Sequence, residues 1–288
     1  MLNEKPPCVE YISQSLEYMS NITEHAITWA RQAGKMAMRY FKNVSVEYKS
    51  DDTLLTQADV EIEQFLVAQI SSTYPDHALL GEEGARNEIN SPYMWVIDPL
   101  DGTTTFVQGL PGWGIALGLL YLGQPIFGLF YMPLLDDLTY TTHDGIYCNQ
   151  QILRQTVRTD WSRKGFLAVT STAHRDFDID LFRTRALGSV SANLVYTARG
   201  SATAALIPKA YLWDLVAAAC ILKQAGGAIC YLSGKPVDYR ALTDGRLAPE
   251  AIIAGHPDLL AQLQRAIRPR EARLIKPSHD SNQTKRPL

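Results

Sequence analysis

The chain has 288 residues, of which 46% are hydrophobic and 20% charged, a composition typical of a soluble globular protein with a substantial core. Its formal net charge of −3 gives no basic excess to suggest nucleic-acid binding. Four scattered cysteines fit neither a zinc site nor a disulfide framework, which favours reduced thiols in the cytoplasm. Residues 1–14 contain no apolar segment, so we expect no secretory signal.

Apolar periodicity predicts alternating helices and strands along the first half of the chain. In order, the expected elements are helices over 21–42 and 57–73, strands over 77–81 and 95–98, a hairpin within 113–134, and a strand near 138–142. The stretch from Gly102 to Leu135 has no charged residue and is long enough for a membrane span. Because Gly123-Gln124-Pro125 divides it, we predict a buried β-hairpin instead.

The second half continues the alternation of the two element types. The expected elements are a strand over 166–171, helices over 177–185, 190–199 and 211–227, a strand over 251–255, and a helix over 256–267. Such alternation is typical of a layered α/β fold, here of α+β character. The domain organisation predicted from it is a 1–20 extension, a 21–157 subdomain, a 158–267 subdomain and a disordered 268–288 tail.

Acidic residues end or interrupt several apolar segments, where a charge is costly unless it is paired or bound to a metal. They are Glu82, Glu83, Asp98, Asp101 and Asp214. Strand ends and helix starts converge on one cleft in α/β proteins, so we expect these carboxylates to meet there. Oxygen ligands without histidine or cysteine nearby favour Mg²⁺ over zinc.

The residues Gly102-Thr103-Thr104 follow the second aspartate directly and would expose backbone N–H groups to an anion. Taken singly, each acidic residue is better explained as a turn or a helix cap. Three carboxylate clusters around one Gly-Thr-Thr element are much less expected by chance. Together they predict a phosphoryl-transfer site.

Three motifs resemble the signatures of the inositol monophosphatase family: GEE at 81–83, WVIDPLDGTTTF at 95–106 and WDLVAAACILKQAGG at 213–227. The resemblance spans about residues 22–265. It implies a Mg²⁺-dependent, lithium-sensitive phosphatase with the layered αβαβα sandwich shared with fructose-1,6-bisphosphatase. It also implies a homodimer that acts on a small phosphorylated metabolite, without nucleic-acid or membrane partners.

The resemblance implies a role for each matching residue. The implied metal ligands are Glu82, Asp98, Asp101, Asp214 and the backbone carbonyl of Leu100. The implied catalytic residues are Glu82 and Thr103, with Asp59 supporting Thr103 as it orients and deprotonates the attacking water. The implied substrate contacts are Glu82, Leu100, Asp101, Gly102, Thr103, Gly188, Ser189, Val190 and Asp214.

Two departures concern the alcohol side of the substrate. Thr105 stands where the family has asparagine, and Ile207 stands where inositol phosphatases usually have a glutamate that contacts the inositol hydroxyls. An apolar side chain cannot accept a hydrogen bond. We expect one or two hydroxyls and an apolar wall around the alcohol, without a carboxylate, formed by Gly188, Ser189, Val190, Thr203 and Ile207. This predicts broad activity on small sugar or polyol phosphates, with inositol 1-phosphate accepted but not strongly preferred.

Alternatives within the family are phosphatases of fructose 1,6-bisphosphate, histidinol phosphate or adenosine 3′,5′-bisphosphate. The last two often carry lysine at the position of Thr104. A phosphatase of the HAD type would need D-x-D-G-T, whereas Asp98 and Asp101 are one residue further apart. Gly112-x-Gly114 lacks the third glycine of a dinucleotide fingerprint. A relative that only binds ligands would have lost a metal ligand, and none is lost.

Overall fold

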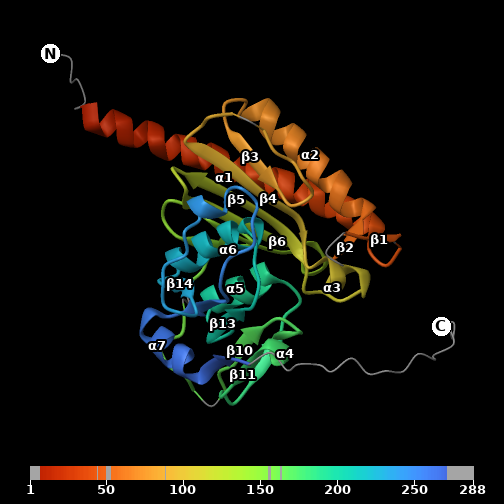
Figure 1. Cartoon of the computed structure of the whole chain (residues 1–288). Helices are drawn as coiled ribbons and strands as arrows, with labels where there is room; N and C mark the ends of the chain where they lie inside the picture. The colour runs from red at the N-terminus through yellow and green to blue at the C-terminus, as the bar shows by residue number, and fades with distance from the viewer. Residues whose placement is uncertain are drawn as a thin grey trace.

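The computed structural model describes residues 7–43, 45–49, 53–87, 89–154, 157–162 and 164–270. Helices and sheets alternate in five layers (Figure 1). The expected αβαβα sandwich is therefore confirmed. None of the helices in the described ranges is both long and apolar enough to cross a membrane.

The first helix layer consists of α1 (Pro7–Tyr40) and α2 (Gln57–Thr73), which pack on each other and on one face of a large sheet. This sheet has seven strands, in the order β3 (Ala78–Gly81), β4 (Tyr93–Asp101), β5 (Gly114–Tyr121), β6 (Gln124–Met132), β7 (Asp137–Thr141), β8 (Ile146–Cys148) and β9 (Gln151–Ile152). Strand β3 runs parallel to β4, and the other neighbours are antiparallel. The uncharged stretch forms the hairpin β5–β6, as predicted.

The middle layer consists of α5 (Val190–Ala198) and α6 (Leu212–Gln224), which lie between the large sheet and a second sheet. The second sheet has the order β12 (Thr184–Ala186), β10 (Leu167–Val169), β13 (Ala204–Ile207), β15 (Ile252–Gly255) and β14 (Ala228–Tyr231). Helix α7 (Pro257–Ala266) packs on this sheet from outside.

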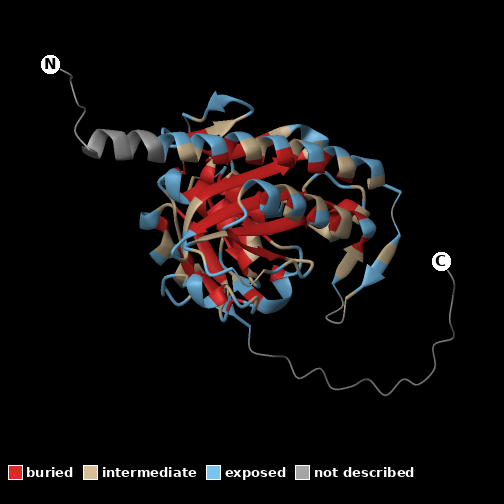
Figure 2. Cartoon of the chain, turned by 90° about the horizontal axis from the view of Figure 1, so that it is seen from above, coloured by how far each residue is buried: buried red, intermediate tan, exposed pale blue. Residues whose placement is uncertain are grey.

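Short elements complete the described ranges. They are β1 (Val46–Tyr48), β2 (Leu54–Thr56), α3 (Thr103–Val107), the 3₁₀ turns η1 (Pro133–Leu135) and η2 (Arg240–Leu242), α4 (Ala173–Asp176), β11 (Phe177–Ile179) and β16 (Ile267–Pro269). Figure 2 shows that the buried residues concentrate in the central strands, whereas the peripheral helices are exposed on their outer sides. The site described below therefore rests on well-packed strands and helices.

Three expectations about the elements are wrong in detail. Residues 177–185 hold β11 and β12 rather than a helix, and the alternation of Phe177, Asp178 and Ile179 between buried and exposed positions explains why. Helix α1 begins at Pro7, so the expected boundary at residue 20 falls inside it. The expected disordered tail includes β16, which pairs with β11, and residues 271–288 lie outside the described ranges.

Helix α6 lies against the large sheet with no side chain between the two backbones at Gly128. A Cβ atom there would lie 2.1 Å from the carbonyl oxygen of Ala217, and one on Gly118 would lie 2.5 Å from Val216 Cγ1. These two glycines let the helix approach the sheet, and so they set the position of Asp214 at its first turn.

We predict that Gly128→Ala destabilises the protein. At an unobstructed strand position, alanine would stabilise by about 0.5–1 kcal/mol relative to glycine, whereas overpacking costs about 1–3 kcal/mol. Urea unfolding measures the sign, and an unchanged or increased free energy of unfolding would contradict the close contact.

Candidate active site

A bulge in β4 brings Asp98 and Asp101 to the same cavity. The pairing of β4 with β5 is regular up to Asp98 and shifts register before Asp101. In a regular strand, residues three apart point to opposite faces, but an extra residue in the bulge changes this alternation. Both carboxylates consequently line one cavity, although each is almost wholly buried as a residue.

Glu82 reaches the same cavity from the neighbouring strand. Strand β3 pairs with β4 so that Gly81 faces Ile97, and the Glu82 N–H continues the ladder by donating to the Ile97 carbonyl at 3.1 Å. Glu82 and Asp98 are therefore neighbours across the carboxyl ends of two parallel strands. This agrees with the expectation that these carboxylates meet where the strands end.

Helices α5 and α6 of the middle layer supply the partners of Asp101 and Asp214 itself. Asp214 lies in the first turn of α6, where its Oδ2 accepts the Tyr211 N–H at 2.6 Å. The carboxylate of Asp101 accepts the N–H groups of Ser191 at 2.6 Å and Val190 at 3.3 Å, both in the first turn of α5. One oxygen each of Asp98, Asp101 and Asp214 lies within 4.8 Å of the other two.

These carboxyl groups hold protons more tightly than exposed ones do. Burial, together with the charges of Glu82, Asp101 and Asp214, raises the pKa of Asp98 well above its usual range. Burial and the charges of Asp101 and Glu82 do the same to the pKa of Asp214. Burial raises the pKa of Asp101 to about 6, against the opposing effect of its hydrogen bonds from Ser191. A cation among them would favour the ionised forms.

The donor chemistry of this group fits a hard divalent cation. Its members offer only oxygen atoms, and no histidine, cysteine or methionine lines the cavity in the described part of the chain. Mg²⁺ prefers such ligands. The carboxylates of Asp98, Asp101, Asp214 and Glu82, with the Leu100 carbonyl, are the groups available to hold it.

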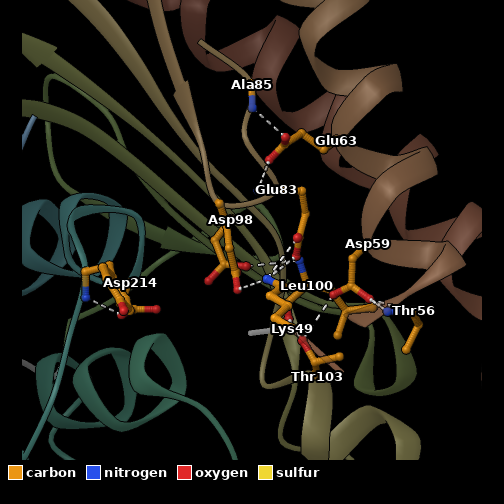
Figure 3. A network of polar contacts seen from close by, with 12 residues as sticks. Lys49, Thr56, Asp59, Glu63, Glu83, Ala85, Asp98, Leu100, Thr103 and Asp214 are labelled. Atoms are coloured by element: carbon orange, nitrogen blue, oxygen red, sulfur yellow. Dashed lines mark hydrogen bonds and ion pairs between the residues drawn. The ribbon is translucent and has the colours of Figure 1, made fainter. Parts of the chain in front are cut away.

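The Lys49 side chain forms an ion pair with Glu82. Its Nζ lies 3.0 Å from Glu82 and 2.8 Å from Glu83, as Figure 3 shows for the labelled members of this network. Burial lowers the pKa of Lys49, but the two carboxylates outweigh it and the net pKa is raised. Burial and the charge of Glu82 raise the pKa of Glu83 to about 7. Glu83 thus gives the lysine a second partner beside the cavity.

Thr103 connects the cavity to the buried carboxylate of Asp59. The Thr103 hydroxyl oxygen lies 3.1 Å from Asp59 Oδ1 and 3.2 Å from the Leu100 carbonyl (Figure 3). The other oxygen of Asp59 accepts the N–H and the hydroxyl of Thr56 at 2.8 and 2.5 Å. A hydroxyl that donates to Asp59 keeps its lone pairs to accept a hydrogen bond from a group in the cavity.

The turn that carries Gly102 fits closely against the segment that leads into α5. Gly102 has φ 94°, and a Cβ there would lie 2.9 Å from Ser189 Cβ. The hydroxyl of Thr105 donates to the Gly188 carbonyl at 2.6 Å. Thr105, the departure from the family's asparagine, therefore links α3 to the segment before α5 beside the site.

The cavity has a volume of about 500 Å³. It is lined by Glu82, Asp98, Leu100, Asp101, Gly102, Thr103, Gly188, Ser189, Val190 and Asp214, which are all the expected site residues except Asp59. Asp59 is fully buried and reaches the cavity through Thr103. The structure thus brings the expected residues together around one space.

The expectation for Ile207 and Thr203 is wrong. Both are fully buried, and neither lines the cavity. Ile207 belongs to the central strand β13, and its side chain packs in the core shared with α5 and α6. Ile207 was identified by its spacing from Asp214 along the chain, and that spacing does not determine the direction in which the Ile207 side chain points.

Thr104 and Thr105, which the sequence also singled out, line the cavity as well. The lining residues that the sequence did not indicate are Thr53, Leu54, Gln108, Leu110, Val169, Thr170, Ser171, Ala186 and Asn193. Val169 and Ala186 end the parallel strands β10 and β12, so the carboxyl end of a predicted strand was a usable signal for this wall. For the described residues of the lining, every formal charge is negative, and the remaining polar groups are neutral hydroxyls and amides.

Comparisons with known proteins identify the family of this chain. The inositol monophosphatase family model matches residues 18–268. Inositol monophosphatase 1 of Sus scrofa is 29% identical over 236 residues, which cover 75% of this chain and 85% of that protein. The inositol-1-monophosphatase of Bacillus subtilis is 29% identical over 256 residues, covering 83% and 94%.

Solved structures show the same fold. An IMPase of Thermotoga maritima superposes with a TM-score of 0.74 at 24% identity, covering 85% of this chain and 96% of that one. An IMPase/NADP phosphatase complexed with Mg²⁺ and phosphate gives a TM-score of 0.76 at 20% identity, covering 86% and 95%. With a family model matched over most of its length, the chain belongs to the inositol monophosphatase family and is a phosphatase.

Proposed function

We propose that the protein is a Mg²⁺-dependent phosphatase that hydrolyses small phosphomonoesters of neutral alcohols by direct attack of water. One observation carries the proposal: all the formal charges on the described cavity lining are carboxylates, and three of them converge within 4.8 Å. Such a cavity repels a phosphate unless cations bind there first. A structure of the same fold complexed with Mg²⁺ and phosphate supports this proposal.

The proposed ligands of Mg²⁺ are Glu82, Asp98, Asp101, Asp214 and the Leu100 carbonyl. When bound, Mg²⁺ supplies positive charge that activates water and stabilises the leaving alkoxide. The chain keeps these ligands in place with backbone donors: the N–H groups of α5 hold Asp101, and the Tyr211 N–H holds Asp214. Mg²⁺ at Glu82 would compete with Lys49, which can stay paired with Glu83.

Thr103 and Asp59 are the proposed pair that orients the attacking water. The Thr103 hydroxyl would accept a hydrogen bond from the water while it donates its own hydrogen bond to Asp59. The water oxygen would then point a lone pair toward phosphorus. Asp59 is held from its other side by Thr56 and so keeps Thr103 in one rotamer. The phosphate would lie against the backbone N–H groups of Gly102 and Thr103.

The cavity favours one class of substrate among the alternatives. Bisphosphates such as fructose 1,6-bisphosphate or adenosine 3′,5′-bisphosphate need a counter-charge for their second phosphate, and the described lining holds no lysine, arginine or histidine. Neutral hydroxyls and amides, including Thr170, Ser171 and Asn193, instead suit a sugar or polyol. Sensitivity to lithium, a homodimeric assembly and a cytoplasmic location belong to the same proposal.

The metal assignment predicts that Asp98→Asn or Asp214→Asn lowers the rate of phosphate release at saturating Mg²⁺ more than 100-fold, an order of magnitude typical of losing a metal's contribution. Asparagine keeps the shape of the side chain and removes a repelling charge, so the melting temperature in EDTA should not fall. Asp76→Asn, at an exposed position, is the matched control. Near-normal Mg²⁺-dependent turnover in either variant would refute the assignment.

The raised pKa values predict that protons compete with Mg²⁺. Below the pKa of about 6 of Asp101, the carboxyl group is protonated and must lose its proton before it binds a cation. Between pH 7.5 and pH 5, the Mg²⁺ concentration for half-maximal activity should therefore rise by about tenfold or more. A Mg²⁺ requirement independent of pH would contradict this prediction.

The raised pKa of Asp101 also predicts that the free energy of unfolding of the metal-free protein falls as the pH rises through 6, because a raised acid pKa favours folding at low pH.

The charge of the cavity predicts a preference among substrates. The value of kcat/KM for inositol 1-phosphate and glycerol 2-phosphate should exceed that for fructose 1,6-bisphosphate and adenosine 3′,5′-bisphosphate by at least about tenfold, because nothing in the described lining offsets a second phosphate. Release of inorganic phosphate from this panel at fixed Mg²⁺ measures the ratio. A bisphosphate as the best substrate would overturn this part of the proposal.

A further inference from the structure

The buried side chain of Glu63, on α2, is hydrogen-bonded to the turn that follows Glu82. Its Oε2 accepts the Glu83 N–H at 2.8 Å, and its Oε1 accepts the Ala85 N–H at 2.9 Å (Figure 3). Glu63 is 5% exposed, so these bonds are shielded from water. Both oxygens of the carboxylate are therefore engaged by the backbone of the turn.

The chain makes room for this carboxylate at Gly81. A Cβ at that position would lie 2.2 Å from Glu63 Oε2 and 2.6 Å from its Cδ. Gly81 also donates its N–H to the Ala85 carbonyl at 2.7 Å, which closes the turn on itself. The turn and the carboxylate of Glu63 thus fit each other closely.

Glu82 stands between two fixed points of the backbone. On one side, its own N–H is bonded to Ile97 of β4 at 3.1 Å, and on the other, the N–H of Glu83 is bonded to Glu63. Its side chain is about one-fifth exposed and contacts Lys49, itself paired with Glu83, at 3.0 Å. The direction in which Glu82 points is therefore set mainly by the backbone that Glu63 holds.

We propose that Glu63 is a positioning residue for the cation site: by holding the 82–85 turn it directs Glu82 toward the aspartates and so sets the affinity for Mg²⁺. The inference rests on the proposed function. It adds a residue of α2 that does not line the cavity and that neither the motifs nor the mechanism uses. Charge-assisted bonds to backbone N–H groups are among the stronger hydrogen bonds, which suits this task.

The test is a thermodynamic cycle on Mg²⁺ binding, measured by isothermal titration calorimetry on the full chain without substrate. Glu63→Gln keeps the size of the side chain but offers one acceptor where two N–H groups need one each. We expect Mg²⁺ to bind about 10–100-fold more weakly, as for other residues that support metal ligands. Glu61→Gln, on the same helix and partly exposed, is the matched control and should bind as the wild type does.

The second arm repeats Glu63→Gln in a Glu82→Gln background. If Glu63 acts through Glu82, it has nothing left to position there, and its effect on the remaining Mg²⁺ binding should vanish. An equal weakening in both backgrounds would show a merely structural role and overturn the inference. Wild-type affinity in the single variant would overturn it as well.

Two controls keep these results interpretable. Wild-type protein that neither binds Mg²⁺ nor releases phosphate with it would refute the proposed function itself, whereas failure of the cycle alone refutes the role of Glu63. If thermal denaturation shows that Glu63→Gln does not fold, Gly81→Ala displaces the same carboxylate from the opposite side. We then expect Gly81→Ala to cause the same loss of Mg²⁺ affinity.

Discussion

The mutual repulsion of buried carboxylates is the constraint on which the rest of the structure depends. Asp98, Asp101 and Asp214 converge within 4.8 Å, and burial raises the pKa of each. Two charges at such a distance in a weakly polar interior cannot both persist without compensation. Backbone N–H groups of α5 and the Tyr211 N–H offset part of this cost, and a divalent cation would offset the rest.

The same constraint couples the site to the packing of the middle helices on the large sheet. Asp98 and Asp101 come from the large sheet, whereas Asp214 and the N–H donors come from the middle helices. Gly128 lets α6 touch the sheet, and Thr105 bonds to Gly188 across the boundary. A cation held by carboxylates of both the sheet and the helix would stabilise their contact by mass action, since it would bind the folded form.

Local patterns account for what the sequence predicted. The strand before Asp98 and the helix after Leu212 are each encoded within a few neighbouring residues, and the acids converge because strand ends and helix starts meet in one cleft. Glu63 was missed because its partners are backbone N–H groups twenty residues away, which leave no side-chain pattern. Ile207 was misplaced because its burial depends on the helices that cover β13 rather than on its neighbours in the chain.

In the proposed function, selectivity for the alcohol would arise apart from this charged centre. A cation and backbone N–H groups would hold a phosphate whatever alcohol it esterifies, so they would give affinity without discrimination. The wall beyond them, with Thr170, Ser171 and Leu110, presents neutral hydroxyls and apolar surface. Apolar surface discriminates weakly, and neutral hydroxyls reject a charged substituent because it would be desolvated without a partner. In the proposed function, the cavity would therefore select by excluding charge rather than by recognising one pattern of hydroxyl groups.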